Sequence, residues 1–287
     1  MADAPRGMDL DRFKPAAGTK DGKSAGPSIH HVPPGPASDP FSIVAKERRV
    51  QEVLASVENL ASLPTVVIKA LALTNSRDSQ ASDFESVIRK DQALAAKVLK
   101  LANSPFFGLR SKVTSIAQAV VVLGIKTMKS VVVAAKTSKL LNQQLTPYGY
   151  DDAGMWKHSI SCAAVSRLVA KKAGLGGDVA EELFVAGLLH DVGKTIVAPH
   201  IAKFPDEFSR AYTESGDLCA TEKELVGISH AEVGGRMAKQ WHLDGQLQEL
   251  IGGHHDPEAA SPAMRVLQVA NDLCNQLGIG RAQGPRA

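Results

Sequence analysis

Histidine and aspartate residues in the second half of the chain have the types and the order of a metal-binding set. They are His158, His190, Asp191, His230, His254, His255 and Asp272. Neutral imidazoles and carboxylates are ligands that Fe, Mn and Zn prefer, and a centre able to hold two such ions suits the hydrolysis of a phosphate ester. The first hypothesis is therefore a divalent transition-metal centre, either of a metallohydrolase or of a protein that keeps only its ligand shell.

The adjacent pair His190 and Asp191 lies within ELFVAGLLHDVGKTIV, whose apolar residues surround most of a predicted buried helix. Neighbouring residues on a helix point about 100° apart, so both can bind one metal only where it lies close against the helix. Lys194 lies one turn further on, beside both side chains. This spacing matches a site in which Asp191 bridges two ions and Lys194, the candidate catalytic residue, orients a water or a phosphate.

The remaining ligands lie on separate apolar-periodic segments, so the cluster forms only if several helices pack around one centre. Burial of so many polar groups without a metal or mutual hydrogen bonds would cost on the order of several kcal/mol. Two other histidines, His200 and His242, lack such a pattern and are left out of the predicted site. The divalent ion is the one cofactor that the sequence predicts.

In this order the ligands resemble those of the HD phosphohydrolase superfamily, particularly its HD-GYP branch. After the histidine pair, however, the chain reads HHDPEAASPAMRVL and lacks the glycine-tyrosine-proline loop that shapes the cyclic dinucleotide pocket of that branch. The preceding half resembles the N-terminal lobe of HDOD (HD-related output) domains. The most specific segments are LPTVV, IRKDQALAAKVLKLANSPFFG and SIAQAVVVLGIKTMKSVVV, and the later GISHAEVGGRMAKQWHL and GGHHDPEAASP are also similar, so the resemblance covers roughly residues 45–278.

The resemblance implies an all-α fold with an N-terminal helical lobe and an HD-like helical lobe. HDOD domains are generally regarded as signalling modules without demonstrated catalysis, and many have lost some metal ligands. It therefore implies a bacterial-type regulatory module that acts by binding a ligand and a partner protein, and that is not an enzyme. The alternative is a metal-dependent phosphohydrolase acting on a phosphate ester or a nucleotide, in which Lys194 aids the phosphate.

Composition divides the chain into four parts. Residues 1–40 hold 7 of the 15 prolines and show no helical period, which predicts a disordered tail. Residues 41–150 are the predicted N-terminal lobe, residues 151–280 the HD-like lobe, and residues 281–287 a short tail.

Helical patterns continue almost without interruption from Phe41 onward. Asp91 is placed to cap DQALAAKVLKLAN, in which Leu94, Val98 and Leu101 recur on one predicted buried face. The preceding helix has the sequence of a capping box at Ser82 and Glu85. After it, SPFFGL breaks the helix, and its two phenylalanines, Phe106 and Phe107, are predicted to pack inward.

The two lobes carry opposite charge. Residues 41–150 contain 15 basic and 7 acidic residues, and residues 151–287 contain 13 basic and 18 acidic residues. A positive surface steers anions, so the first lobe is expected to bind an acidic signalling protein or a nucleotide, while a small molecule or nucleotide is expected to bind at the HD-like pocket. The other interpretation is that the lysines of the first lobe are solvated helix faces. They are Lys97, Lys100, Lys126, Lys129, Lys136 and Lys139.

Other partners and compartments are disfavoured. The sequence has no nucleic-acid reading motif and no strip of arginine and aromatic residues, so we do not expect nucleic-acid binding. No apolar run approaches the ~18 residues needed to cross a bilayer, and the N-terminus lacks the core of a signal peptide, which predicts a cytoplasmic protein without membrane contact. The three cysteines are well separated and are expected to fill the core.

Overall fold

The computed structural model describes residues 40–59, 69, 80–258 and 261–281. The predicted tails at residues 1–39 and 282–287, and the segment LPTVV, lie outside the described residues. Every named element in the described part of the chain is a helix, which confirms the all-α class. The elements are α1 (Ile43–Glu58), α3 (Ala81–Ile88), α4 (Gln92–Ala102), η2 (Pro105–Phe107), α5 (Ile116–Leu123), α6 (Ile125–Leu141), η3 (Thr146–Tyr148), α7 (Gly154–Lys172), α8 (Gly177–Leu189), α9 (Lys194–Ile201), α10 (Pro205–Ser215), α11 (Leu218–Leu225), α12 (His230–Gln240), α13 (Gly245–Gly252) and α14 (Pro262–Gln276).

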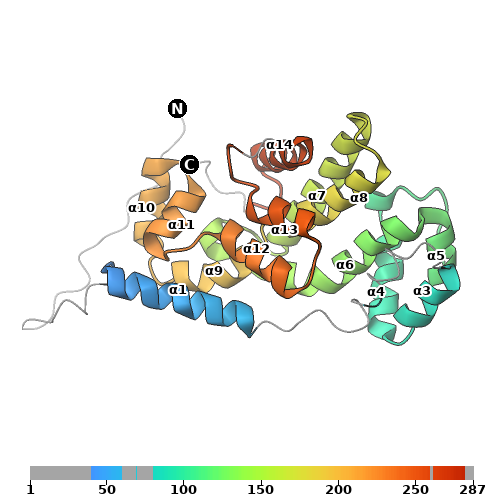
Figure 1. Cartoon of the computed structure of the whole chain (residues 1–287), viewed down its shortest axis with the longest axis horizontal. Helices are drawn as coiled ribbons and strands as arrows, with labels where there is room; N and C mark the ends of the chain where they lie inside the picture. Colours follow the sequence, from blue (N-terminus) through green and yellow to red (C-terminus); the bar gives the residue numbers. More distant parts are fainter. Residues whose placement is uncertain (1–39, 60–68, 70–79, 259–260, 282–287) are drawn as a thin grey trace, which may run out of the picture. The chain divides into compact units, whose positions relative to one another are not determined.

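The helices contact one another in two groups that meet at α6 (Figure 1). Helices α3, α4 and α5 pack together and against α6, and α6 also contacts α7 and α8. In the second group α7 packs against α8 and α14, and α12 against α13 and α9. Helix α1 contacts α9 and α12, although its sequence position lies within the predicted first lobe. The predicted boundary near residue 150 remains a prediction.

The helix starts in the first lobe follow local capping chemistry. Asp91 caps α4 as predicted, because its side chain accepts a hydrogen bond from the backbone N–H of Leu94 at 2.9 Å. The capping box of α3 is formed by Gln80 and Asp83, two residues before the predicted pair. The reason is that α3 already begins at Ala81, which places Ser82 inside its first turn.

The buried face of α4 is close to the predicted one. Leu94 is 3% exposed and Val98 is fully buried, but Leu101 is only half-buried and Ala102 takes the third buried position. Of the two phenylalanines that follow, Phe107 is buried, with its ring centroid 5.3 Å from that of Phe184 on α8, whereas Phe106 is exposed. The prediction that both pack inward was therefore wrong for Phe106.

Leu94→Ala is expected to lower the free energy of unfolding by about 2–5 kcal/mol, because it removes a buried apolar side chain from the core. Leu101→Ala is the matched comparison on the same helix and should cost less, since Leu101 already contacts solvent. Urea denaturation of the two variants measures the difference. Equal losses would contradict the buried face that the structure assigns to α4.

Two lysines of the first lobe pair with acids of the second. The ammonium of Lys126 pairs with Asp178 at the start of α8, and that of Lys129 lies 3.4 Å from the Asp244 carboxylate that caps α13. On the same helix, Ser130 donates to the buried side chain of Glu181 at 2.9 Å. Part of the opposite charge of the lobes is thus neutralised where α6 meets the second group.

Among the described residues, none of the helices is long and apolar enough to cross a membrane. Cys162 and Cys274 are buried, as expected of residues that fill the core, and Cys219 is half-buried.

Candidate metal centre

The His190–Asp191 pair lies at a junction between two helices. Helix α8 ends at Leu189 and α9 begins at Lys194, so the motif occupies a turn and not the continuous helix that its apolar pattern predicts. In this turn the N–H of Lys194 donates to the Asp191 carbonyl and that of Val192 to the Leu189 carbonyl, each at 2.9 Å. These bonds span three residues in place of four and tighten the chain locally.

The first group of histidines surrounds atom Oδ1 of Asp191. His230 Nε2 lies 3.2 Å and His254 Nε2 lies 3.6 Å from this oxygen. His255 completes a set of four residues whose ligand atoms all lie within 4.8 Å of one another. His230 and His254 are buried, and His255 is exposed, so the set opens to solvent on one side.

The second group lies on the other side of the carboxylate, at Oδ2. His190 Nε2 and His158 Nε2 lie 3.5 and 3.6 Å from it, and both rings are buried. Unlike Oδ1, however, Oδ2 already accepts two hydrogen bonds from the protein. Lys194 Nζ donates at 2.6 Å and the hydroxyl of Tyr150 at 3.0 Å. The two faces of Asp191 are therefore chemically different.

Asp272 does not join the cluster. It is exposed on α14, while its neighbour Asn271 is 5% exposed and faces the second group. The side-chain oxygen of Asn271 lies 3.1 Å from His158 Nε2 and 3.3 Å from His190 Nε2. The reason is the rotation of about 100° per helical residue, which turns Asp272 away from the face that Asn271 occupies. A neutral amide thus stands where the sequence predicted a carboxylate.

The ring orientation of three histidines is fixed by a partner behind each ring. His190 Nδ1 donates to the Gly187 carbonyl and His254 Nδ1 to the Ile251 carbonyl, each at 2.8 Å. His230 Nδ1 donates to the Glu222 carboxylate at 2.7 Å. Such bonds place the proton on Nδ1 and direct the Nε2 lone pair toward a metal.

Sequence reasoning missed Glu222 and the two tyrosines. Glu222 is fully buried, and it also accepts a hydrogen bond from the hydroxyl of Tyr148 at 2.6 Å. A pattern could have found it, because Glu222 interrupts the apolar stripe that Leu218 and Leu225 form on α11. Nothing in the segment PYGY indicates that Tyr150 contacts a residue 41 positions later.

Burial keeps most of the histidines neutral. It lowers the pKa of His158, His190 and His254 to about 4. His255 is exposed as a residue, but partial desolvation of its ring beside the cluster, together with the neighbouring His254, lowers its pKa to about 3. At neutral pH each of these rings therefore offers an unprotonated nitrogen.

The pKa values of three buried groups shift in the direction opposite to the one that burial alone would give, because charged partners lie beside them. Burial opposes the charged form of Asp191, but His190 and Lys194 outweigh it and hold the pKa of this carboxyl well below its usual range. Burial likewise opposes the charge on Lys194, yet Asp191 raises the pKa of the ammonium. For His230, Glu222 outweighs burial and raises the pKa, so an ion that binds this ring must displace its Nε2 proton. The centre thus combines a carboxylate anion with a fixed ammonium.

Orphaned polar atoms test whether a metal fits. Asp191 Oδ1, His230 Nε2 and His254 Nε2 are buried and form no hydrogen bond in the described part of the chain. Such unsatisfied groups are costly, and a cation between them would satisfy all three. The first group therefore fits one divalent ion, held by Asp191, His230, His254 and His255. The second group fits a further ion poorly, because Oδ2 is already engaged and Asn271 adds no charge.

The fold and the cluster together define an HD-related helical module with a His/Asp cluster whose geometry can hold a metal ion. The HDOD domain model matches residues 60–257, which is more than half of the chain. The chain belongs to the HDOD family.

One solved structure with a similar fold carries the same family name, and two further relatives are similar in sequence. The crystal structure of an HDOD domain protein of unknown function from Geobacter sulfurreducens is 25% identical, with a TM-score of 0.66 over 85% of this chain and 83% of its own. A protein from Shewanella amazonensis SB2B named "Putative phosphohydrolase" is 28% identical, with a TM-score of 0.66 over 79% and 81%. An uncharacterized protein of Treponema pallidum is 22% identical over 222 residues, which are 75% of this chain and 42% of the relative. The chain thus spans less than half the length of that curated relative.

Proposed function

We propose that the chain is a regulatory HDOD module that holds one transition-metal ion and acts by binding a ligand and a partner protein. The observation that carries the proposal is the asymmetry of Asp191. Its Oδ1 faces three histidines, of which His230 and His254 have unsatisfied buried Nε2 atoms, whereas its Oδ2 is held by Lys194 and Tyr150. A metallohydrolase that clamps a phosphate between two ions needs both faces of a bridging carboxylate.

The residues themselves support binding over turnover. A bound ion would supply Lewis acidity for polarising a phosphate oxygen. Lys194, predicted to orient a water or phosphate, is 7% exposed and committed to Asp191 at 2.6 Å. Turning it toward a substrate would leave a buried charge without its partner, which is expensive. The exposed His255 gives the centre its one contact with solvent among its four ligands.

A metal-dependent phosphohydrolase is the second candidate function. It is favoured by the intact set of Asp191, His230, His254 and His255, and by the name of the Shewanella relative. If the protein is a phosphohydrolase, a phosphate ester would enter the centre on the exposed side of His255. Lys194 would then have to exchange Asp191 for the substrate.

Turnover distinguishes the two candidates. We expect negligible hydrolysis of cyclic dinucleotides, and at most slow cleavage of an activated phosphate ester, even with Mn or Fe added under anaerobic conditions. The physical reason is that positioning supplies much of the rate in such reactions, and only one face of Asp191 is free to position an ion. Product formation by the wild type is compared with that of Asp191→Ala. A substantial wild-type rate that the variant loses would make the protein an enzyme.

For the partner, we propose an acidic signalling protein in the cytoplasm that docks on the first lobe. Support comes from the excess of basic residues there, since complementary charge steers association. Lys126 and Lys129 contribute less than the sequence suggests, because they pair with Asp178 and Asp244 of the same chain.

A further inference from the structure

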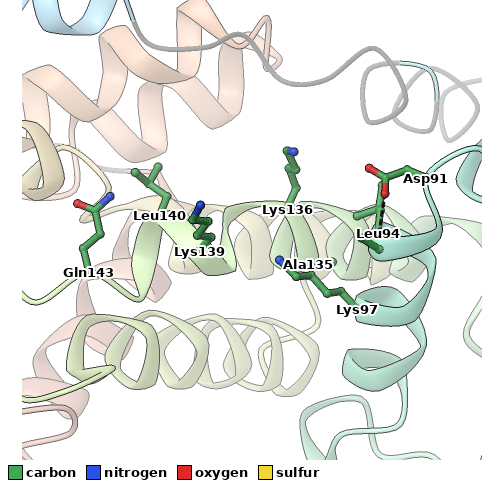
Figure 2. A pocket seen from close by; sticks show the side chains of 9 residues that line it. Asp91, Leu94, Lys97, Ala135, Lys136, Lys139, Leu140 and Gln143 are labelled. Atoms are coloured by element: carbon green, nitrogen blue, oxygen red, sulfur yellow. Dashed lines mark hydrogen bonds between the residues drawn. The ribbon is translucent and has the colours of Figure 1, made fainter.

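A cavity of about 430 Å³ lies in the first lobe, between α4 and α6 (Figure 2). Its apolar part is formed by Leu94 from α4 and by Ala135 and Leu140 from α6. Three lysines line the same space: Lys97 from α4, and Lys136 and Lys139 from α6. Figure 2 shows Lys97 extending from α4 toward Ala135 on α6. Amines from two helices thus share one cavity with an apolar wall.

These lysines have no partner in the described part of the chain. None of Lys97, Lys136 and Lys139 forms a hydrogen bond or an ion pair there, whereas Lys126 and Lys129 on the same α6 both do. Asp91 is the single acid among the lining residues, and its carboxylate is engaged with the backbone N–H of Leu94. The cavity therefore carries an excess positive charge that nothing described in the chain neutralises.

Lys97 and Lys139 are exposed and Lys136 is half-buried, but all three line one hollow together with apolar residues from two helices. Like charges around one cavity repel one another, and an anion placed between them relieves that repulsion. Lysine ammonium groups bind phosphate as point charges. A single carboxylate would match only one of the three amines, whereas a mono- or diphosphate carries two or three negative charges. A cavity of about 430 Å³ also lies within the range of small-molecule sites.

We propose that this cavity binds a small organic phosphate of the nucleoside mono- or diphosphate class. The phosphate groups lie among Lys97, Lys136 and Lys139, and the apolar body lies against Leu94, Ala135 and Leu140. The proposal names a ligand class for the regulatory module and requires no metal. It therefore stands or falls separately from the metal centre.

Calorimetric titration of the full chain with ADP and GDP tests the site. We expect binding that Lys136→Gln/Lys139→Gln weakens by about tenfold or more, since that variant removes two of three charges. Lys172→Gln/Lys239→Gln is the matched control: it removes the same charge from exposed residues outside the cavity and should bind as the wild type does. Adenosine should give no heat, and added salt should weaken ADP binding.

Four results of these titrations, and a fifth from protein treated with a chelator, would overturn the proposal. The four are the absence of heat with both nucleotides at millimolar concentration, equal weakening by the control variant, pyrophosphate binding as tightly as ADP, and a glutamate-rich peptide binding more tightly than ADP. Protein treated with a chelator is expected to keep its affinity for ADP. Loss of that affinity on metal removal would place the ligand at the metal centre and exclude the cavity.

Discussion

Asp191→Ala should abolish metal binding, taking the content of the purified protein from about one transition-metal ion per chain to none. The reason is that, among the described residues, Asp191 is the carboxylate that groups with all three of His230, His254 and His255, and it supplies the anionic charge that offsets that of the ion. The measurement is elemental analysis of protein that lacks a histidine tag and is prepared without chelator. Addition of Mn, Fe or Zn should also raise the melting temperature of the wild type and not of the variant, because an ion that binds only the folded state stabilises it.

Asp272→Ala is the control for that experiment. It removes the same carboxylate from the exposed face of α14, next to Asn271, and should leave the metal content unchanged. Loss of metal from this variant would show that Asp272 binds the ion after all. Wild-type protein that contains no metal and gains no stability from Mn, Fe or Zn would refute the metal centre itself.

The ordered histidines made most of the cluster predictable, because each falls on a segment with its own apolar period. The residue that α14 contributes to the cluster was predicted as Asp272 and is Asn271, although the sequence contains the information needed to choose it. On α14 the buried Leu267 and Cys274 lie four residues before and three residues after Asn271, so the periodic face includes Asn271 and excludes Asp272. The prediction chose Asp272 because carboxylates bind metals, and it did not take into account that the helical period places Asn271 on the buried face.

Other parts of the site depend on contacts that local patterns do not contain. The apolar residues around LLHDVGK are compatible with one long helix, and only the packing of the turn against α12 reveals the junction at His190. Likewise, Tyr150 reaches Asp191 from a position whose sequence context is ordinary, whereas the contact of Lys194 with Asp191 follows from their spacing. The hydrogen bonds from Tyr150 and Lys194 occupy Oδ2 of Asp191 and so leave one face of the carboxylate for a metal. The number of ions could therefore not be predicted from the order of the ligands along the sequence.

Charge composition gave the correct sign for the first lobe but not the role of each lysine. Lys126 and Lys129 belong to the same helix as Lys136 and Lys139, and the sequence does not separate them. The pairing of the first two with Asp178 and Asp244 follows from the contact between α6 and the second group. Lys136 and Lys139 form no such pair within the described part of the chain.

Gly193→Ala should be among the most damaging single substitutions in the chain. Gly193 has an ordinary helical φ of −60°, so alanine is not excluded by the backbone conformation. A Cβ atom at this position, however, would lie 2.0 Å from the carbonyl oxygen of His230 and 2.7 Å from the backbone nitrogen of Gly234. Both contacts are with the backbone of α12, which cannot rotate away as a side chain can.

The turn and α12 would therefore have to separate, and this close approach is what places Asp191 beside His230. We expect a loss of stability at or above the upper end of the ~1–3 kcal/mol typical of overpacking, together with a reduced metal content. Urea denaturation and elemental analysis of the same preparation measure the two effects. Gly177→Ala is the control, because its Cβ would meet no atom within 4 Å at the start of α8, and it should be neutral or slightly stabilising. If Gly193→Ala matched that control in both measurements, the packing of the HD turn against α12 would be wrong.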